Sequence, residues 1–331
     1  MFSSSTQLKF WTFSGVTELN RLRAEANETY VSEYGKNETI YYLTAEDETK
    51  VRRHYEYVIK DFCTRFQPPM PRSVLGTALV FFKRIYLHNS IMDYHPRDIQ
   101  HTCVYLACKV EEFNVSLQQF VAQLKGDREA AMDVILSQEL LLMRLLHFHL
   151  TVHNPFRPLE GLFIDLKTRC EDIDNVERLR PGAEEFLDKA LHTDVPLIFS
   201  PSQIALAGIL ASGKNAGVSL DNYVANKLLV SGGQENLLKT VEHIKRIKYM
   251  VKNQDPLIRE DVKILERRLD ACRNPENNPN SETFKRKMEE YLDDEDEKKA
   301  KKRQKWEEVR LCFVHSSVYI QIFLSFSRRN Q

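Results

Sequence analysis

Two charged residues lie at the edges of apolar helical runs, where an ion is costly unless it is paired or faces a partner. Lys109 follows the apolar residues 104–108, and Glu139 leads into the leucines at 140–142. A lysine and a carboxylate in such places could form an internal ion pair that fixes the packing of two helices. They could equally lie in an apolar groove and hydrogen-bond the backbone of another protein. The sequence leaves these two interpretations open, and neither of them is a catalytic role.

No catalytic or metal-binding motif accompanies these two residues. His147, His149 and His153 lie close together, but their spacing straddles a predicted helix end, and no Cys, Asp or Glu nearby completes a ligand set. The chain lacks Gly-x-Ser-x-Gly, a glycine-rich phosphate loop and His-Glu-x-x-His. Its six cysteines form no Cys-x-x-Cys pair, which is typical of buried thiols in a reducing compartment. We therefore expect a binding protein that is not an enzyme and has no cofactor or metal site.

The segment that ends at Lys109 occurs twice in the chain. Residues 95–109 are similar to residues 200–214, and each copy starts with a polar residue and proline, which is typical of a helix start. Each copy is followed by Val-Ser-Leu-x-x-aromatic-Val, at 115–121 and at 218–224. The copies are about 105 residues apart, whereas solenoid repeats are about 20–50 residues long, so the pattern indicates a duplicated domain.

The spacing of apolar residues predicts an all-α chain, and glycine and proline are few, at 11 and 12 of 331 residues. The first repeat contains five predicted helices, at 47–66, 72–88, 96–111, 116–124 and 129–147. The second contains five more, at 158–169, 175–196, 201–216, 219–229 and 234–253. Flanking helices are predicted near residues 16–30 and over 257–272. The segment 129–147 is apolar almost all round, so we expect it to be buried in the core.

These elements predict five regions along the chain. They are an N-terminal arm and helix at 1–46, a first helical domain at 47–152, a second at 153–254, a C-terminal helix at 255–273 and a charged tail at 274–331. The tail cannot bury enough apolar surface to fold alone. One basic cluster in it is either a nuclear import signal or a solvated charge run, and consists of Lys298, Lys299, Lys301, Lys302, Arg303 and Lys305.

Charge and hydropathy argue against two broad classes of function. Lys and Arg total 47, as do Asp and Glu, so the net charge is zero, which argues against a protein that grips nucleic acid mainly through phosphates. The apolar stretch at 311–326 is shorter than the roughly 20 residues of a membrane span, and the N-terminus shows no secretory signal. We expect no direct contact with nucleic acid or membrane.

Several of these stretches resemble the cyclin family, whose members consist of two five-helix repeats. Residues 106–113, Leu-Ala-Cys-Lys-Val-Glu-Glu-Phe, look like the cyclin-box signature at the end of the third helix. Glu139 with the apolar residues after it is similar to the fifth-helix motif. Within the family, the chain resembles the cyclin H type in ordered stretches at 10–14, 70–74, 82–84, 94–97, 112–116, 152–155, 164–169 and 201–206. The implied fold is two tandem cyclin-box repeats flanked by N- and C-terminal helices.

The resemblance implies a regulatory subunit that binds and activates a kinase and performs no catalysis itself. For the cyclin H type, the kinase is cyclin-dependent kinase 7 and the third subunit is the ménage-à-trois assembly factor. Their complex is the CDK-activating kinase, which also joins the core of general transcription factor IIH, so the implied roles are cell-cycle control and RNA polymerase II transcription in the nucleus.

The resemblance also implies which residues bind. Lys109 and Glu139 match the pair that hydrogen-bonds the kinase near its αC helix, and Glu112 and Phe113 belong to the same signature. Trp11 lies with Phe13 in an aromatic N-terminal cluster, for which packing on its own domain is favoured over a direct contact with a partner.

Two departures from the family pattern limit the comparison. Residues 51–55, Val-Arg-Arg-His-Tyr, stand where cell-cycle cyclins carry a Met-Arg-Ala-Ile-Leu patch for docking substrates, so we expect no such docking. After 306–308 the chain departs from the acidic tail of the cyclin H type, and we hypothesise that residues 309–331 derive from an unspliced intron or a wrong gene model.

Two alternatives to the cyclin H type stay open. One is another transcriptional cyclin, similar to cyclin C. The other is a DNA-binding general transcription factor with two cyclin folds, similar to transcription factor IIB. The second would favour an N-terminal zinc ribbon and a basic second repeat, and this chain has no Cys-x-x-Cys pair and no net charge.

Overall fold

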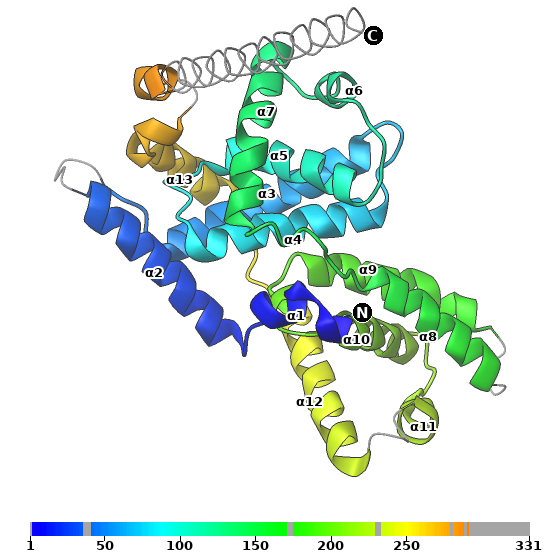
Figure 1. The fold of residues 1–331 in the computed structure, drawn as a ribbon. Helices are drawn as coiled ribbons and strands as arrows, with labels where there is room; N and C mark the ends of the chain where they lie inside the picture. Colours follow the sequence, from blue (N-terminus) through cyan, green and yellow to red (C-terminus); the bar gives the residue numbers. More distant parts are fainter. Residues whose placement is uncertain are drawn as a thin grey trace, which may run out of the picture. The chain divides into compact units, whose positions relative to one another are not determined.

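The structure is a computed structural model that describes residues 2–35, 41–170, 175–228, 233–278, 281–287 and 290. The predicted all-α fold is confirmed, because these residues contain helices and turns and no strand. The described residues up to 274 form one compact unit, and the described residues from 275 onward belong to a second (Figure 1). The basic cluster at 298–305, the apolar stretch at 311–326 and residues 309–331 lie outside the described residues.

The first repeat contains the five helices expected of it. They are α3 (Ala45–Arg65), α4 (Arg72–His88), α5 (Pro96–Val110), α6 (Leu117–Val121) and α7 (Arg128–Leu145). Helix α4 is buried along most of its length and packs against α5, which packs in turn against α7. A capping box between Thr44 and Asp47 starts α3, and another between Ser116 and Gln119 starts α6.

The prediction that the fifth helix is buried all round is wrong. In α7 only Ile135, Gln138 and Leu142 are buried, whereas Leu136 and Leu140 are 54% and 45% exposed. The helix lies on the outside of the repeat, so one side of it faces the core and the other does not. An apolar sequence pattern does not distinguish a face that packs in the core from a face left for another molecule.

The second repeat repeats the order of helices with two irregular segments. Its helices are α8 (Phe156–Arg169), α9 (Arg180–Leu191), α10 (Pro201–Asn215), α11 (Asp221–Tyr223) and α12 (Gly233–Lys252). The helix predicted at 175–196 is shorter, because Thr193 bonds the backbone on both sides and ends α9. Turns η2 (Val176–Leu179) and η3 (Val195–Leu197) flank it, and α11 continues into the π-helical turn η4 (Val224–Leu228) where one helix was predicted.

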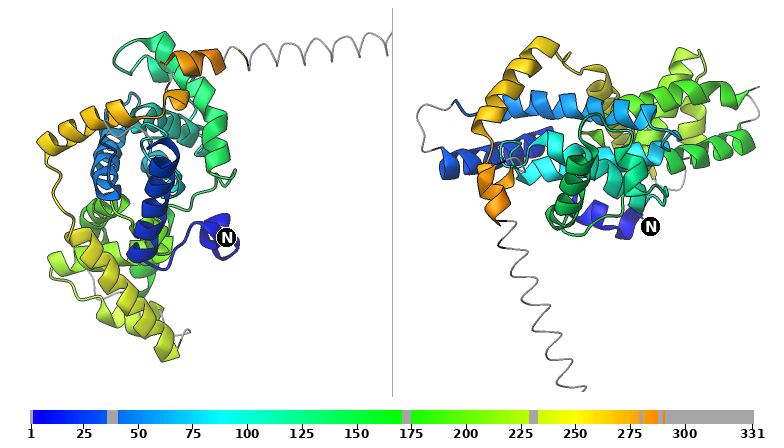
Figure 2. Two further views of the ribbon diagram at one scale, coloured as in Figure 1. Left: turned by 90° about the vertical axis from the view of Figure 1, so that its left-hand side faces the viewer. Right: turned by 90° about the horizontal axis from the view of Figure 1, so that it is seen from above.

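Two flanking helices dock on these repeats. Helix α2 (Val16–Tyr34) places Leu19 in the core of the second repeat and Tyr30 in the core of the first. The left view of Figure 2 shows α2, in dark blue, running along both repeats. Helix α13 (Arg259–Cys272) packs on α3, and the Tyr30 hydroxyl donates to the carbonyl of Cys272 at 2.9 Å. The short helix α1 (Thr6–Phe10) was not predicted.

A buried group of ions joins the two repeats and α2. Asp194, just after α9, accepts two hydrogen bonds from Arg23 of α2, at 2.7 and 2.8 Å. Arg52 lies 3.9 Å from Asp194 and 2.7 Å from Glu56, which also binds Lys83 at 2.5 Å. Burial alone would raise the pKa of Asp194, but Arg23 and the other cations lower it well below its usual range. Asp194 is therefore held as a carboxylate at the junction of the repeats.

No helix in the described part of the chain is long and apolar enough to cross a membrane. In the second unit, the turn η6 (Pro275–Asn277) is followed by a helical segment at 282–287, and Lys287 forms an ion pair with Glu276 at 2.6 Å.

Candidate functional site

Lys109 and Glu139, which the sequence singled out, are in contact. Lys109 lies in the last turn of α5, Glu139 lies near the middle of α7, and the Lys109 Nζ is 2.5 Å from the Glu139 Oε1. The Lys109 side chain is 47% exposed and the Glu139 side chain 16% exposed. The Nζ atom also lies 4.7 Å from the centre of the Tyr105 ring. The pair therefore links two helices and is also open to solvent on its lysine side.

Apolar side chains flank this ion pair on the outer face of α7. Leu136 and Leu140 lie one turn apart, on either side of Glu139 in the sequence, and about half of each side chain is exposed. Exposed leucines around a paired charge are typical of a surface that another protein covers. We call this surface, made of Lys109, Leu136, Glu139 and Leu140, the α5–α7 surface. Both leucines belong to the apolar segment 129–147, which the sequence pattern alone places in the core.

The residues that follow Lys109 shape the turn after α5. Glu112 has a positive φ of 56° and is exposed, and the chain reverses there so that the Phe113 amide donates to the Cys108 carbonyl at 2.9 Å. Phe113 packs against the first core, with its ring centre 6.4 Å from that of Phe66. The structure thus brings Lys109 and Glu139 together, leaves Glu112 at the surface and uses Phe113 for packing.

The N-terminal aromatic cluster packs on its own chain. Trp11 is 2% exposed, its Nε1 donates to the His149 Nδ1 at 3.0 Å, and the Arg84 guanidinium lies 5.0 Å from its ring centre. The Phe13 amide donates to the Leu197 carbonyl at 2.8 Å. These contacts tie the N-terminal arm to both repeats.

Two of the three histidines that could have suggested a metal make other contacts. His149 accepts the bond from Trp11 and stacks on Phe10, with ring centres 4.9 Å apart. The His153 amide donates to the Gln7 side chain at 2.7 Å. Within the described ranges, no three His, Cys, Asp or Glu side chains are placed to hold a metal ion.

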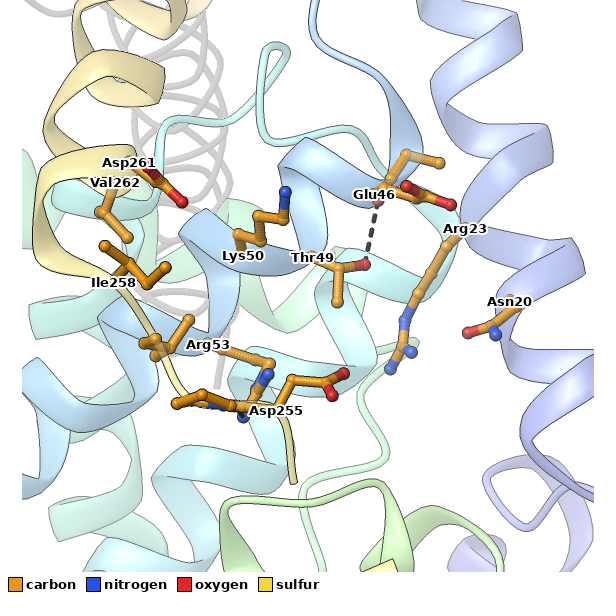
Figure 3. Close-up of a pocket in the computed structure, with 13 residues that line it drawn as sticks. Asn20, Arg23, Glu46, Thr49, Lys50, Arg53, Asp255, Ile258, Asp261 and Val262 are labelled. Atoms are coloured by element: carbon orange, nitrogen blue, oxygen red, sulfur yellow. Dashed lines mark hydrogen bonds between the residues drawn. The ribbon is translucent and has the colours of Figure 1, made fainter. Parts of the chain in front are cut away.

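A polar cavity of about 680 Å³ lies between α2, α3 and the start of α13 (Figure 3). Its lining includes the cations Arg23 and Arg53 and the carboxylates Asp255 and Asp261, and Arg53 donates to the Asp255 carbonyl at 2.8 Å. Positive and negative side chains are thus mixed in its lining.

The segment at 51–55 lies beside this cavity and is largely covered. Val51, Arg52 and Tyr55 are buried, and the Tyr55 hydroxyl donates to Glu266 of α13 at 2.8 Å. Most of the segment is therefore inaccessible in this unit.

Comparison with protein families identifies both repeats. Residues 28–151 match the cyclin N-terminal domain, and residues 154–252 match the cyclin C-terminal domain. The chain belongs to the cyclin family. It is also 43% identical over 284 residues to Cyclin-H of Xenopus laevis, a match that covers 83% of this chain and 88% of that one. The resemblance to cyclin H is thereby confirmed.

Solved structures show the same cyclin fold. A chain in the CAK complex of Chaetomium thermophilum, bound to ATP-γ-S, superposes with a TM-score of 0.76 at 22% identity, covering 88% of this chain and 93% of that one. A chain of the yeast TFIIK complex, which contains Kin28, Ccl1 and Tfb3, superposes with a TM-score of 0.57 at 25% identity, covering 75% and 99%.

Proposed function

We propose that this cyclin binds and activates a cyclin-dependent kinase of the cyclin-dependent kinase 7 type through the α5–α7 surface. The observation that carries the proposal is the Lys109–Glu139 pair, which is preformed between two half-exposed leucines. Membership of the cyclin family supports a kinase partner, and the similarity to Cyclin-H supports the type of kinase. The cyclin acts as a regulatory subunit, and the kinase supplies all catalytic residues.

Activation follows from differential binding. A protein kinase is active only when its β3 lysine is paired with the αC glutamate and its metal-binding aspartate is in place. A rigid surface that fits only this arrangement shifts the kinase population towards it. Shifting a two-state equilibrium from 1:99 to 99:1 takes about 5.5 kcal/mol of differential binding. Burying the exposed halves of Leu136 and Leu140 contributes roughly 1–3 kcal/mol of binding energy, so a wider interface must supply the rest.

The ion pair suits recognition of a kinase backbone. A lysine ammonium has three donors and a carboxylate has several acceptor positions, so each retains hydrogen-bonding capacity after they pair with each other. Because Glu139 holds Lys109 in one place, the two side chains lose little further freedom on binding. Glu112, exposed on the turn after α5, lies within the same signature and extends the polar edge of the surface.

The cyclin H type of assembly supplies the remaining partners in this proposal. They are the ménage-à-trois assembly factor and the core of general transcription factor IIH, and the complex acts in the nucleus in cell-cycle control and transcription. The similarity to a chain of the yeast TFIIK complex supports this assignment. The basic cluster at 298–305 would serve nuclear import.

The test compares two ion pairs in the full-length chain. Lys109→Ala/Glu139→Ala removes the pair that links α5 and α7, and Lys239→Ala/Glu235→Ala removes an exposed pair within α12 as a control. Binding to cyclin-dependent kinase 7 is titrated, kinase activity is assayed, and circular dichroism checks the fold of each variant. We expect the first variant to bind the kinase about tenfold more weakly and to activate it less. The reason is that the two side chains proposed to hydrogen-bond the kinase backbone are removed. Equal binding by both variants would show that the Lys109–Glu139 pair is purely structural.

A further inference from the structure

The second repeat contains a groove at the place that corresponds to the α5–α7 surface. A cavity of about 630 Å³ lies between α10, α11 and α12, which are the third, fourth and fifth helices of that repeat. Most of its lining is apolar and includes Leu210, Val218, Leu220, Val224, Leu237 and Leu238. Leu238 is 63% exposed, although it belongs to a helix whose opposite face is buried. We call this cavity the α10–α12 groove.

The correspondence can be followed residue by residue. Lys214 near the end of α10 repeats Lys109 at the end of α5. Aligning the buried positions of α7 and α12, which pair Gln138 with Thr240 and Leu142 with Ile244, places further residues opposite one another. Exposed Leu136 then corresponds to exposed Leu238, and Glu139 corresponds to Val241. Exposed Leu140 corresponds to exposed Glu242, which does not line the groove. The second groove therefore keeps the lysine and one of the two leucines, and its lining has no carboxylate at the position of Glu139.

The second groove also carries an excess of positive charge. Lys214, Lys245 and Lys248 line it, together with a single carboxylate from Asp221. None of the three lysines forms an ion pair within the described part of the chain. Burial lowers the pKa of Lys248, nearby Lys214 lowers it further, and Asp221 acts in the opposite direction. Two of the three positive charges at this apolar groove are thus without a compensating carboxylate in its lining.

We propose that the α10–α12 groove binds an amphipathic helix of a partner protein that carries acidic residues beside its apolar stripe. An apolar groove between helices accepts a helix whose anchors recur at i, i+3 or i+4 and i+7. Carboxylates next to these anchors would pair with Lys214, Lys245 and Lys248, as Glu139 pairs with Lys109 in the first repeat. The site is separate from the proposed kinase surface, so the cyclin can hold both partners at once.

The probe is a fluorescein-labelled helical peptide with leucines at i, i+3 and i+7 and glutamates beside them. A basic control peptide, its basic twin, carries lysines in place of the glutamates. Binding is measured by fluorescence anisotropy to the full-length chain, alone and in complex with cyclin-dependent kinase 7. We expect the acidic peptide to bind in both cases, more weakly as salt rises, and its basic twin to bind at least about tenfold more weakly.

Matched variants locate the binding site. Leu238→Glu and Lys214→Glu/Lys245→Glu change exposed side chains, so we expect the fold to be retained. Each variant is expected to weaken binding of the acidic peptide at least about tenfold. Leu136→Glu is the control, which should leave peptide binding unchanged. A benzophenone placed in the peptide should cross-link to residues of α10 or α12.

Three results would overturn the proposal. They are equal binding of the two peptides, no measurable binding of the acidic peptide, and cross-linking or loss of binding at α7 in place of α12. Kinase binding is titrated in the same variants. A failure of the kinase proposal would appear as unchanged kinase affinity in Leu136→Glu, which is independent of the peptide result.

Discussion

The two repeats place the same pair of helices at the surface but give them different charges. In the first repeat, Glu139 neutralises Lys109 between two exposed leucines. In the second, Val241 stands at the place of the carboxylate, and the lysines of the groove are left in excess. The helix starts are alike, since Pro96 and Pro201 both occupy first positions. A duplicated scaffold can therefore keep its core and change partners through a few exposed side chains.

The comparison requires that the two repeats are held as one unit, and Asp194 provides the strongest test. Asp194→Ala should lower the free energy of unfolding by about 3–5 kcal/mol, because Arg23 and Arg52 would be buried without their carboxylate. Urea unfolding measures the loss. The control is Glu235→Ala at an exposed pair on α12, which should change stability by less than about 0.5 kcal/mol. A comparable, small loss in both variants would mean that the junction is held by other contacts.

Exchanging one leucine in each repeat separates their roles. Leu136→Glu should weaken kinase binding about 100-fold, since it places an unpaired charge in an apolar contact. Leu238→Glu, at the corresponding position of the second repeat, should change kinase affinity by less than about twofold. Isothermal titration calorimetry with cyclin-dependent kinase 7 measures both constants. Equal effects would show that the kinase does not distinguish the repeats.

The buried side chain of His192, two residues before Asp194, makes the stability of the protein depend on pH. His192 stacks on Tyr57 with ring centres 4.5 Å apart, and neither ring nitrogen has a hydrogen-bond partner among the described residues. Burial lowers its pKa to about 3, and Lys83 adds to this effect. In the unfolded chain its pKa is about 6.5. The unfolded state therefore binds the proton first, and stability is lost as the pH falls from about 6.5 towards 3.

His192→Phe should remove one part of this pH dependence and keep the stacked ring. When the pH is lowered from 7 to 5, protonation of His192 in the unfolded state should lower the free energy of unfolding of the wild type by about 2 kcal/mol. The variant should lack this contribution. Urea unfolding at the two pH values gives the difference. An unchanged slope with pH would mean that His192 is not responsible for it.

The smallest effect comes from building the missing carboxylate into the second repeat. Val241→Glu should compensate Lys214 or Lys245 and weaken the acidic peptide by about threefold to tenfold, with less than about 1 kcal/mol change in stability. A fluorescence anisotropy titration measures the affinity of the acidic peptide for the variant. Tighter binding of the peptide would show that its acidic residues do not use these lysines.

Local signals predicted much of this fold. Proline and a polar cap mark the starts of α5 and α10 in the sequence, and both helices begin there. The break after α9 depends on Thr193 and on the distant Arg23, which no local pattern shows. The outer face of α7 was assigned to the core, because hydrophobicity is the same for a core contact and a partner contact.

The candidate site could be predicted only in part. Lys109 and Glu139 stood out as charges beside apolar runs, but whether they paired depended on the packing of α5 against α7. The groove in the second repeat could not be predicted as a site, because Lys214 lies on α10 whereas Lys245 and Lys248 lie on α12, and these two helices come together only in the fold.

Hydrogen–deuterium exchange of the cyclin, with and without cyclin-dependent kinase 7, tests most directly which repeat binds the kinase. We expect slower exchange in the kinase complex over α7 and the end of α5, and little change over α10 and α12. Protection confined to α10 and α12, with α7 unchanged, would contradict this expectation.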